Sequence, residues 1–135
     1  MKYLITGGAG FIGSHLTETL LNSGHHVTIL DDMSTGTYSN INHYKEHEKL
    51  NFILGSILDV NLVQDLVSKC DQVYHLAAVV GVKHVMKNPV ETIRINTLGT
   101  ENILHFCSKY GKKVLIASTS EVYGDPEIHP QKENY

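Results

Sequence analysis

The sequence has few cysteines, few cations and no long apolar run, and each of these absences argues against a class of protein. Its two cysteines, Cys70 and Cys107, are too few for a disulfide framework, so we expect buried thiols in a reducing compartment. The 11 Lys and Arg residues are scattered, which argues against nucleic acid as a partner. No apolar run approaches membrane-spanning length, and the N-terminus lacks the pattern of a signal peptide. We therefore expect a cytoplasmic protein that binds neither nucleic acid nor membrane.

The sequence does contain alternating strand-like and helix-like segments, in a chain of one-domain length. Its 135 residues are 41% hydrophobic with a net charge of −3, as is ordinary for a globular domain. Apolar β-rich runs predict strands at 2–6, 26–30, 50–55, 72–78 and 113–119. Helical periodicity predicts helices at 11–24, 59–70 and 89–111, with Asp59 as the N-cap of the second. Residues 31–40 are expected to form a loop, 41–49 allow a short helical turn, and no element is expected after 119.

This alternation predicts an α/β fold. Strands that alternate with helices form a parallel sheet covered on both faces, and the near-continuous apolar character of these strands fits burial on both sides. The expected architecture is a doubly wound parallel sheet of the Rossmann type, with strand order 3-2-1-4-5 and right-handed crossovers, that ends after its fifth strand.

The stretch "ITGGAGFIG" (5–13) places glycines where the first strand should turn into the first helix. Gly7, Gly10 and Gly13 are spaced G-x-x-G-x-x-G. Glycine supplies positive φ for a tight turn and lets a pyrophosphate approach the backbone, while the helix N-terminus attracts its negative charge. A glycine-rich turn that serves only strand–helix packing is the alternative. The strand before the motif and the helix after it favour dinucleotide binding.

An acidic residue at the end of the second strand indicates which dinucleotide is bound. The carboxylate of Asp31 is placed to accept hydrogen bonds from both hydroxyls of an adenosine ribose, and it would repel a 2′-phosphate. Because no Arg or Lys occurs from 31 to 44, the sequence favours NAD over NADP. The neighbouring Asp32 is a weaker candidate for the same site, with a solvated loop residue as the alternative.

Several motifs together resemble the extended short-chain dehydrogenase/reductase family of NAD-dependent nucleotide-sugar epimerases, dehydratases and decarboxylases. The resemblance runs through "TGGAGFIGSHL" (6–16), "DDMSTG" (31–36), "VYHLAA" (73–78), "NTLGTENIL" (96–104) and "ASTSEVYGDP" (117–126). It covers the whole chain and is far more specific than the glycine motif alone.

The resemblance implies a role for a set of individual residues. The residues implied to bind the cofactor are Gly7, Gly10, Phe11, Ile12 and Gly13 at the pyrophosphate, Asp31 and Asp32 near the ribose, Ile57 at the adenine, and Leu76, Ala77, Ala78 and Asn96 along the rest of the dinucleotide. Thr119 takes the place of the catalytic hydroxyl that hydrogen-bonds the reacting oxygen of the sugar, and Glu121 stands where some dehydratases and decarboxylases keep an acid. Tyr123 is a nearby site residue. The alternatives are a β-branched strand end for Thr119 and a solvated charge for Glu121.

Departures from the family pattern bear on the reaction. Ser120 replaces the Asp that dehydratases keep before the Glu, which argues against dehydration. The run "STSEVYGDPEIHPQ" (118–131) is close to that of UDP-glucuronate decarboxylases, yet "AAVVGVKH" (77–84) lacks their "SP" stretch. Val80 stands where galactose-type 4-epimerases often place Lys, and Ser56 replaces an adenine-contacting Asp.

The family's Tyr-x-x-x-Lys pair, which removes the hydroxyl proton of the sugar, is missing: no tyrosine of the 135 residues has a lysine four positions later. We therefore expect residues 1–135 to be the NAD-binding N-terminal part of a longer enzyme whose C-terminal substrate domain is absent here, and the chain alone to be inactive. The favoured parent activity is 4-epimerisation of a nucleotide sugar, most simply a UDP-sugar, with decarboxylation of a UDP-uronate as the alternative. A non-catalytic NAD-binding module is an alternative of another class. A homodimer is also expected from the resemblance.

No metal site is predicted. His43 and His47 have a spacing of one helical turn, but no carboxylate or cysteine completes a site, so we interpret them as surface residues. His75 is expected to be a packed histidine with one satisfied nitrogen, and Cys107 a core residue.

Overall fold

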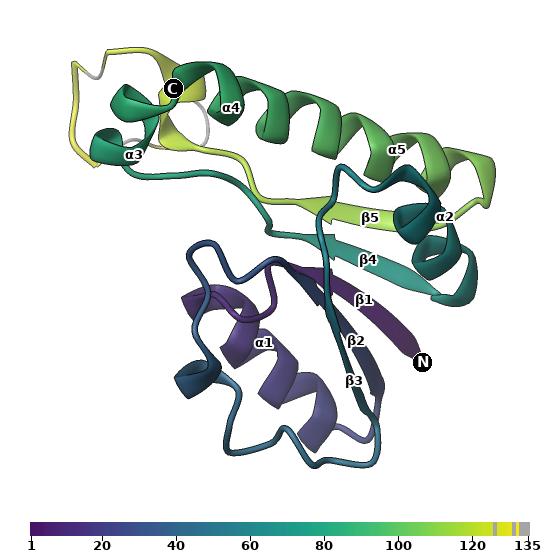
Figure 1. Cartoon of the computed structure of the whole chain (residues 1–135). Helices are drawn as coiled ribbons and strands as arrows, with labels where there is room; N and C mark the ends of the chain where they lie inside the picture. The colour runs from purple at the N-terminus through teal and green to yellow at the C-terminus, as the bar shows by residue number, and fades with distance from the viewer. Residues whose placement is uncertain (126, 131, 133–135) are drawn as a thin grey trace.

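The computed structural model describes residues 1–125, 127–130 and 132, with the backbone alone at 82–84, 120 and 121. Its centre is a sheet in the order β3-β2-β1-β4-β5, in which every pairing is parallel (Figure 1). The strands are β1 (Lys2–Thr6), β2 (His26–Asp31), β3 (Leu50–Leu54), β4 (Gln72–His75) and β5 (Lys113–Ile116). The predicted Rossmann-type strand order is confirmed.

Helices cover both faces of the sheet. Figure 1 shows α1 (Phe11–Asn22) on one face and α2 (Val60–Lys69) with α5 (Thr100–Lys109) on the other. Because successive strand residues point to opposite faces, Leu4 joins the core under α2 and α5 while Ile5 joins the core under α1. The central strands β1 and β2 are buried on both faces, which explains their continuous apolar runs, whereas the edge strands β3 and β5 are half-buried or exposed.

The predicted helix at 89–111 is divided into three segments. These are α4 (Pro89–Arg94), the π-helical turn η2 (Ile95–Gly99) and α5, which ends at Lys109. Pro89 opens the first segment, where its missing N–H is not needed. The prediction that Asp59 caps α2 is confirmed, because its carboxylate accepts a hydrogen bond from the Leu62 N–H at 3.0 Å.

Three strands are shorter than predicted, β3 by a single residue, and three short elements were not foreseen. β4 ends at His75 and β5 at Ile116, so residues 76–78 and 117–119 leave the sheet as irregular backbone. The unforeseen elements are the 3₁₀ turns η1 (Tyr38–Asn40) and η3 (Ser120–Tyr123) and the helix α3 (Val82–Lys87). Residues 41–47 form hydrogen-bonded turns instead of a helical turn. Apolar periodicity cannot find such pieces, because they are too short to show it.

β5 is an edge strand with exposed apolar side chains. Leu115 is 48% exposed and Ile116 is 40% exposed. An unpaired, apolar edge favours pairing with another chain or segment, so self-association stays a prediction. Among the described helices, none combines the length and the apolar character needed to cross a bilayer.

Both cysteines are buried, as predicted, and their thiols are held in the protonated form. Cys70 is 4% exposed and Cys107 is 2% exposed. Burial raises the pKa of the Cys70 thiol to about 11, and it also raises the pKa of Cys107. Since only the thiolate is reactive, these thiols serve as core residues.

Candidate functional site

The turn between β1 and α1 requires glycine at two positions for steric reasons. Gly7 has φ +75°, and a Cβ there would lie 2.8 Å from the Ala77 backbone nitrogen. A Cβ at Gly13 would lie 2.7 Å from the Gly8 Cα and would also overlap the Gly7 carbonyl oxygen. The turn is therefore packed directly against α1 and against the backbone that follows β4.

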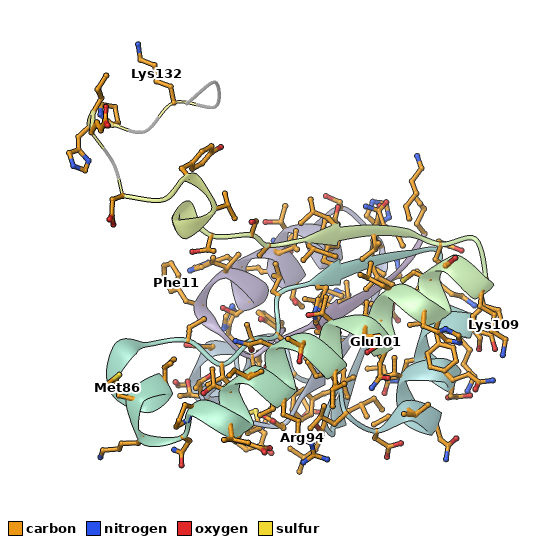
Figure 2. All side chains as sticks on the ribbon, turned by 90° about the horizontal axis from the view of Figure 1, so that it is seen from above. Phe11, Met86, Arg94, Glu101, Lys109 and Lys132 are labelled. Carbon is orange, nitrogen blue, oxygen red and sulfur yellow. The ribbon has the colours of Figure 1, made fainter. Side chains whose placement is uncertain are left out.

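Gly10 differs from these two glycines, because the space beside it is open. It is the N-cap of α1, with φ −75° and ψ 176°, and a Cβ there would meet only the Gly7 carbonyl oxygen, at 3.3 Å. The next two side chains project into solvent, Phe11 with 77% and Ile12 with 66% of its surface exposed; Figure 2 shows Phe11 projecting outward at the start of α1. The first N–H groups of a helix have no partner within it and carry partial positive charge. The start of α1 therefore offers an accessible place for an anion.

Asp31 connects this turn to the end of β2. Its side chain is only 8% exposed, with Oδ2 accepting a hydrogen bond from the Ala9 N–H and Oδ1 accepting one from the Met33 N–H, both at 2.9 Å. A carboxylate oxygen accepts more than one hydrogen bond, so both oxygens keep capacity for a ligand hydroxyl. The adjacent Asp32 is exposed and accepts a hydrogen bond from the Ser34 N–H at 2.9 Å.

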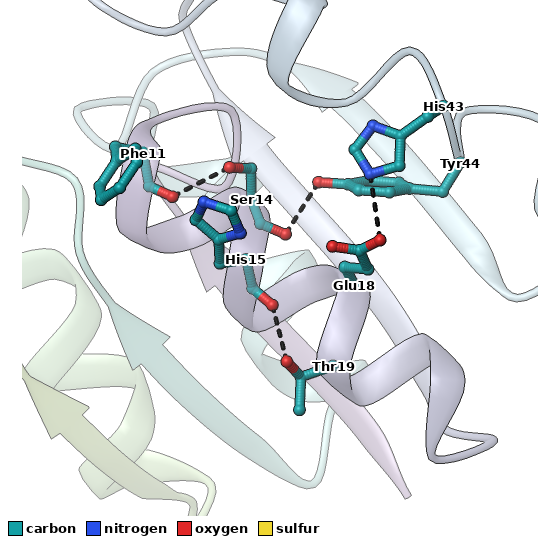
Figure 3. Close-up of polar contacts among 7 residues, drawn as sticks. All are labelled: Phe11, Ser14, His15, Glu18, Thr19, His43 and Tyr44. Atoms are coloured by element: carbon teal, nitrogen blue, oxygen red, sulfur yellow. Dashed lines mark hydrogen bonds and ion pairs between the residues drawn. The ribbon is translucent and has the colours of Figure 1, made fainter.

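The loop after β2 holds the glycine-rich turn from outside. The Ala9 carbonyl accepts hydrogen bonds from the Asn40 side-chain amide at 2.8 Å and from the Thr37 N–H at 3.2 Å. The Tyr44 hydroxyl donates to the Ser14 carbonyl at 3.0 Å, as Figure 3 shows. Burial, more than any other influence, raises the pKa of Tyr44 to about 12, so this donor keeps its proton. No local sequence pattern indicates these contacts, because they join segments far apart in the chain.

The opposite wall follows β4 and is held by Asn96. The Asn96 side chain accepts a hydrogen bond from the Val79 N–H at 2.8 Å and donates one to the Val79 carbonyl at 3.0 Å. Both ends of its amide are therefore engaged with the backbone just after Leu76, Ala77 and Ala78. Asn96 lies in the π-helical turn η2, and such turns occur frequently at functional sites.

Ile57 belongs to the packed wall of the site. It is 5% exposed and packs so closely on Gly99 that a Cβ there would overlap its side chain. Its carbonyl accepts a hydrogen bond from the Asn102 side-chain amide at 3.0 Å. Asn102, which lies in α5, thus holds the backbone of the predicted site residue Ile57. No feature of the sequence around Asn102 indicated this role.

These segments surround one cavity of about 780 Å³ at the carboxyl ends of the strands. Every residue predicted to bind the cofactor lines it: Gly7, Gly10, Phe11, Ile12, Gly13, Asp31, Asp32, Ile57, Leu76, Ala77, Ala78 and Asn96. Thr119 lines it as well. The side chain of Glu121 lies outside the described ones, and Tyr123 is 38% exposed in η3. The cavity is also lined by His75, Thr100 and Val79, which were not predicted from the sequence as cofactor-binding residues.

The interpretation of His75 as having one satisfied nitrogen is wrong, because both ring nitrogens have partners. Nδ1 lies 2.7 Å from the Thr6 Oγ1, and Nε2 lies 3.0 Å from the Thr100 Oγ1. The side chain is 3% exposed, and this burial lowers the pKa of His75 from its ordinary value of 6.5. The residue is therefore a neutral, doubly hydrogen-bonded imidazole in the floor of the cavity.

The lowered pKa of His75 predicts a loss of stability in mild acid. Its folded-state pKa lies below its unfolded-state value, so the unfolded chain binds a proton first as the pH falls below about 6.5. The contribution of His75 to the free energy of unfolding is complete above that pH. As the pH falls further, the free energy of unfolding decreases by up to about 1.4 kcal/mol per pH unit until the folded-state pKa is reached. Urea unfolding at pH about 7.5 and about 5.5 should show this loss, and His75→Gln should reduce the difference between the two conditions. The surface variant His105→Gln serves as the control, and an equal pH dependence in all three proteins would contradict the prediction.

No metal centre is found among the described residues, where no group of three or more His, Cys, Asp or Glu side chains is placed to hold an ion. His43 is exposed and lies 3.3 Å from the Glu18 carboxylate, while His47 is half-buried (Figure 3 shows the His43 pair). This agrees with the interpretation of His43 as a surface residue.

Comparison with known proteins gives consistent relatives. Residues 4–135 match the model of the family described as GDP-mannose 4,6 dehydratase. UDP-glucuronic acid decarboxylase 1 of Danio rerio is 47% identical over 99% of this chain and 31% of its own length. UDP-N-acetyl-alpha-D-glucosaminuronate decarboxylase of Bacillus cytotoxicus is 51% identical over 91% of this chain and 38% of its own length. The chain thus spans about a third of the length of these curated relatives.

The solved structures agree with this assignment. UDP-glucose-4-epimerase from Stenotrophomonas maltophila, with bound NAD and formylated UDP-arabinopyranose, superposes with a TM-score of 0.87 at 29% identity. The match covers 98% of this chain and 41% of that one. The family model extends over nearly the whole sequence, and the fold and motifs agree with it. The chain therefore belongs to the GDP-mannose 4,6 dehydratase family, within the extended short-chain dehydrogenases/reductases that its motifs resemble.

Proposed function

We propose that this chain binds NAD in the cavity between the glycine-rich turn and the segment 76–79. The observation that carries the proposal is that Asp31 and the open N-terminus of α1 face one cavity of about 780 Å³. The first supplies acceptors for a ribose and the second a site for a pyrophosphate. The NAD-bound state of the Stenotrophomonas epimerase, which has the same fold, supports the choice of ligand.

The preference for NAD over NADP follows from charge. Residues 31–44 contain two carboxylates at the start of the loop and no Lys or Arg. A 2′-phosphate there would meet a buried carboxylate with no cation to offset the repulsion. Calorimetric titration should show saturable NAD binding and NADP binding weaker by about tenfold or more. A folded chain that binds neither nucleotide, or binds both equally well, would contradict the proposal.

We further propose that residues 1–135 form the NAD-binding part of a longer nucleotide-sugar enzyme. The proposal is supported by the chain's coverage of about a third of its relatives and by its lack of a Tyr-x-x-x-Lys pair. When bound, NAD supplies an acceptor and donor of hydride for a sugar carbon. In this chain, Asp31 and the turn at 7–13 hold the dinucleotide, and Thr119 offers a hydroxyl to the reacting oxygen of the sugar. Glu121 is the proposed acidic group beside it.

We favour decarboxylation of a UDP-uronate as the reaction of the whole protein. The relatives at 47% and 51% identity are named as UDP-uronate decarboxylases, and residues 118–131 resemble the run of such enzymes. This reverses the preference for 4-epimerisation drawn from the sequence, although the Stenotrophomonas epimerase keeps epimerisation as the second candidate. Incubation of the full-length protein with NAD and UDP-glucuronate distinguishes the two, because decarboxylation releases CO₂ and epimerisation preserves every carbon atom.

The chain of 135 residues tested alone in the same assay is expected to bind NAD without turnover. Release of CO₂ or formation of an epimer by the chain alone would show that its own residues remove the hydroxyl proton. The alternative of a non-catalytic NAD-binding module is favoured only if the full-length protein is also inactive on both substrate classes.

A further inference from the structure

We infer that His75 is a positioning residue whose neutral Nε2–H tautomer joins Thr6 and Thr100 into one directed hydrogen-bond chain that holds the NAD-facing backbone at 77–79. The link to NAD rests on the proposed function, whereas the direction of the hydrogen bonds follows from the contacts of the described residues and from a neutral ring.

The proton of Thr100 fixes one half of the chain. The Thr100 hydroxyl donates to the Asn96 carbonyl at 2.7 Å. A hydroxyl has a single proton, so toward His75 Nε2, 3.0 Å away, the Thr100 oxygen acts as the acceptor. The proton of this hydrogen bond therefore belongs to Nε2 of His75.

The other half follows from the neutral ring. An imidazole that carries its proton on Nε2 presents Nδ1 as an acceptor. The Thr6 hydroxyl, 2.7 Å away, then donates to Nδ1, and its oxygen accepts a hydrogen bond from the Ala77 N–H at 3.3 Å. The complete order is Ala77 N–H to Thr6, Thr6 to His75, His75 to Thr100, and Thr100 to the Asn96 carbonyl. Every proton is used once.

Other protonation states break this order. With the proton on Nδ1 instead, Nε2 would require a proton that Thr100 already gives to Asn96. With both nitrogens protonated, the Thr6 oxygen could accept from both Ala77 and His75, but the Thr6 hydroxyl proton would lose Nδ1 as its acceptor. A buried hydrogen-bond partner left unmatched is strongly unfavourable, so the surroundings select one tautomer.

The two ends of this chain reach the same segment of the cavity wall. One end is the Ala77 N–H. The other is the backbone of Asn96, whose side chain holds Val79 by two hydrogen bonds. His75 thus couples the strand β1 and the turn η2 to the backbone at 77–79, which contributes Ala77 and Val79 to the cavity.

Packing alone does not require a histidine at this position. Val73, two residues earlier on the same face of β4, is completely buried and apolar. A branched apolar residue therefore suits this face, whereas burying an imidazole is unfavourable unless its nitrogens are bonded. His75 occupies the last position of the strand, where the cavity begins, and both its nitrogens are bonded.

Nuclear magnetic resonance of the ¹⁵N-labelled chain tests the inference directly. At pH about 6.5, the ring ¹⁵N shifts of His75 should show a neutral Nε2–H tautomer, at a pH where an ordinary histidine is half charged. A ring that is protonated on Nδ1, or on both nitrogens, would overturn the inference. This measurement needs neither a variant nor bound NAD.

Two variants test the two halves separately. His75→Asn and His75→Gln introduce amides that differ in reach: the shorter Asn side chain ends near the position of Nδ1 and can offer its oxygen to Thr6, whereas the longer Gln side chain ends near the position of Nε2 and can offer its NH₂ group to Thr100. We expect the first to shift mainly the Asn96 and Val79 amide signals and the second mainly that of Ala77. NAD affinity should fall roughly 2- to 10-fold in both, and the surface variant His105→Gln should match the original chain in every readout.

The outcomes separate this inference from the proposed function. If the original chain does not bind NAD while the tautomer and the end-specific shifts appear, the proposed function fails and the hydrogen-bond chain stands. If both His75 variants bind NAD as tightly as the original chain does, the positioning role is overturned. It is also overturned if both variants shift the same amide signals. If neither variant folds, the tautomer of the original chain decides.

Discussion

Gly13→Ala is expected to lower the free energy of unfolding by about 3 kcal/mol or more, at the top of the range for overpacking. The added Cβ would overlap the Gly7 carbonyl oxygen and lie 2.7 Å from the Gly8 Cα. Both neighbours are backbone atoms in the turn, so no side chain can rotate away to make room. Thermal unfolding should show a fall in Tm of about 10 °C.

Gly10→Ala is the matched control for stability. In contrast to Gly13→Ala, we expect it to have little effect on the free energy of unfolding and a large effect on NAD affinity. Its Cβ would meet a single atom, the Gly7 carbonyl oxygen at 3.3 Å, and its φ of −75° suits alanine. The expected loss of stability is only about 1 kcal/mol, largely from the poorer N-cap. The methyl group would occupy the approach of the pyrophosphate, so NAD affinity should fall about tenfold or more.

The pair of glycine variants is decisive because stability and binding are measured on both proteins. Urea unfolding gives the first quantity and calorimetric titration the second. Equal stability of Gly13→Ala and the original chain would show that the turn relaxes around the new atom. Undiminished NAD binding by Gly10→Ala would place the pyrophosphate away from the start of α1.

The sheet could be predicted from the sequence because its signals are strong and repeated. Five apolar runs alternate with helical periodicity, and the parallel order 3-2-1-4-5 follows from that alternation. Interruptions within elements were not predictable in the same way. The π-helical turn at Ile95–Gly99 keeps an apolar pattern, and the early ends of β4 and β5 fall inside runs that read as strand. Which residues leave the sheet depends on tertiary contacts that no local pattern records.

The cavity residues were predictable where a motif carried them, and less so where a side chain acts on distant backbone. The predicted cofactor residues all line one cavity, although their roles toward a ligand remain predictions. Asn96 was expected beside the cofactor, but both ends of its amide are bonded to Val79. Asn40 and Thr100 gave no signal, because their partners lie in other segments of the chain.

Asp31→Ala is expected to lower both stability and NAD affinity, because its carboxylate has two tasks. It accepts hydrogen bonds from the Ala9 and Met33 N–H groups, and it is the proposed acceptor for the ribose hydroxyls. Each backbone N–H left unpaired costs about 1–3 kcal/mol, so the loss of both partners is expected to cost roughly 2–6 kcal/mol. NAD affinity should fall about 100-fold, since the turn and the ribose contact are both affected.

Asp31→Asn separates these two tasks. Its amide keeps one acceptor oxygen for a backbone N–H, while its NH₂ group would face the second N–H. We therefore expect Asp31→Asn to lose about half as much free energy of unfolding as Asp31→Ala. Removing the negative charge also removes the repulsion of a 2′-phosphate, so the ratio of NAD to NADP affinity should fall toward one. Asp31→Ala lowers the stability of the turn and removes the ligand contact together. Asp31→Asn keeps more of the stability, so the change in nucleotide preference can be measured separately.

Asp71→Asn is the appropriate control for this pair. Asp71 also accepts a hydrogen bond from a backbone N–H, that of Lys2 at 2.7 Å, but it precedes β4 at the amino ends of the strands, away from the cavity. It should lower stability slightly and leave both nucleotide affinities unchanged. If Asp31→Asn kept the original preference for NAD, the carboxylate would hold the turn alone, and the preference would have to come from another part of the cavity. A fall in that preference, with most of the fold retained, would assign the ribose contact to Asp31 itself.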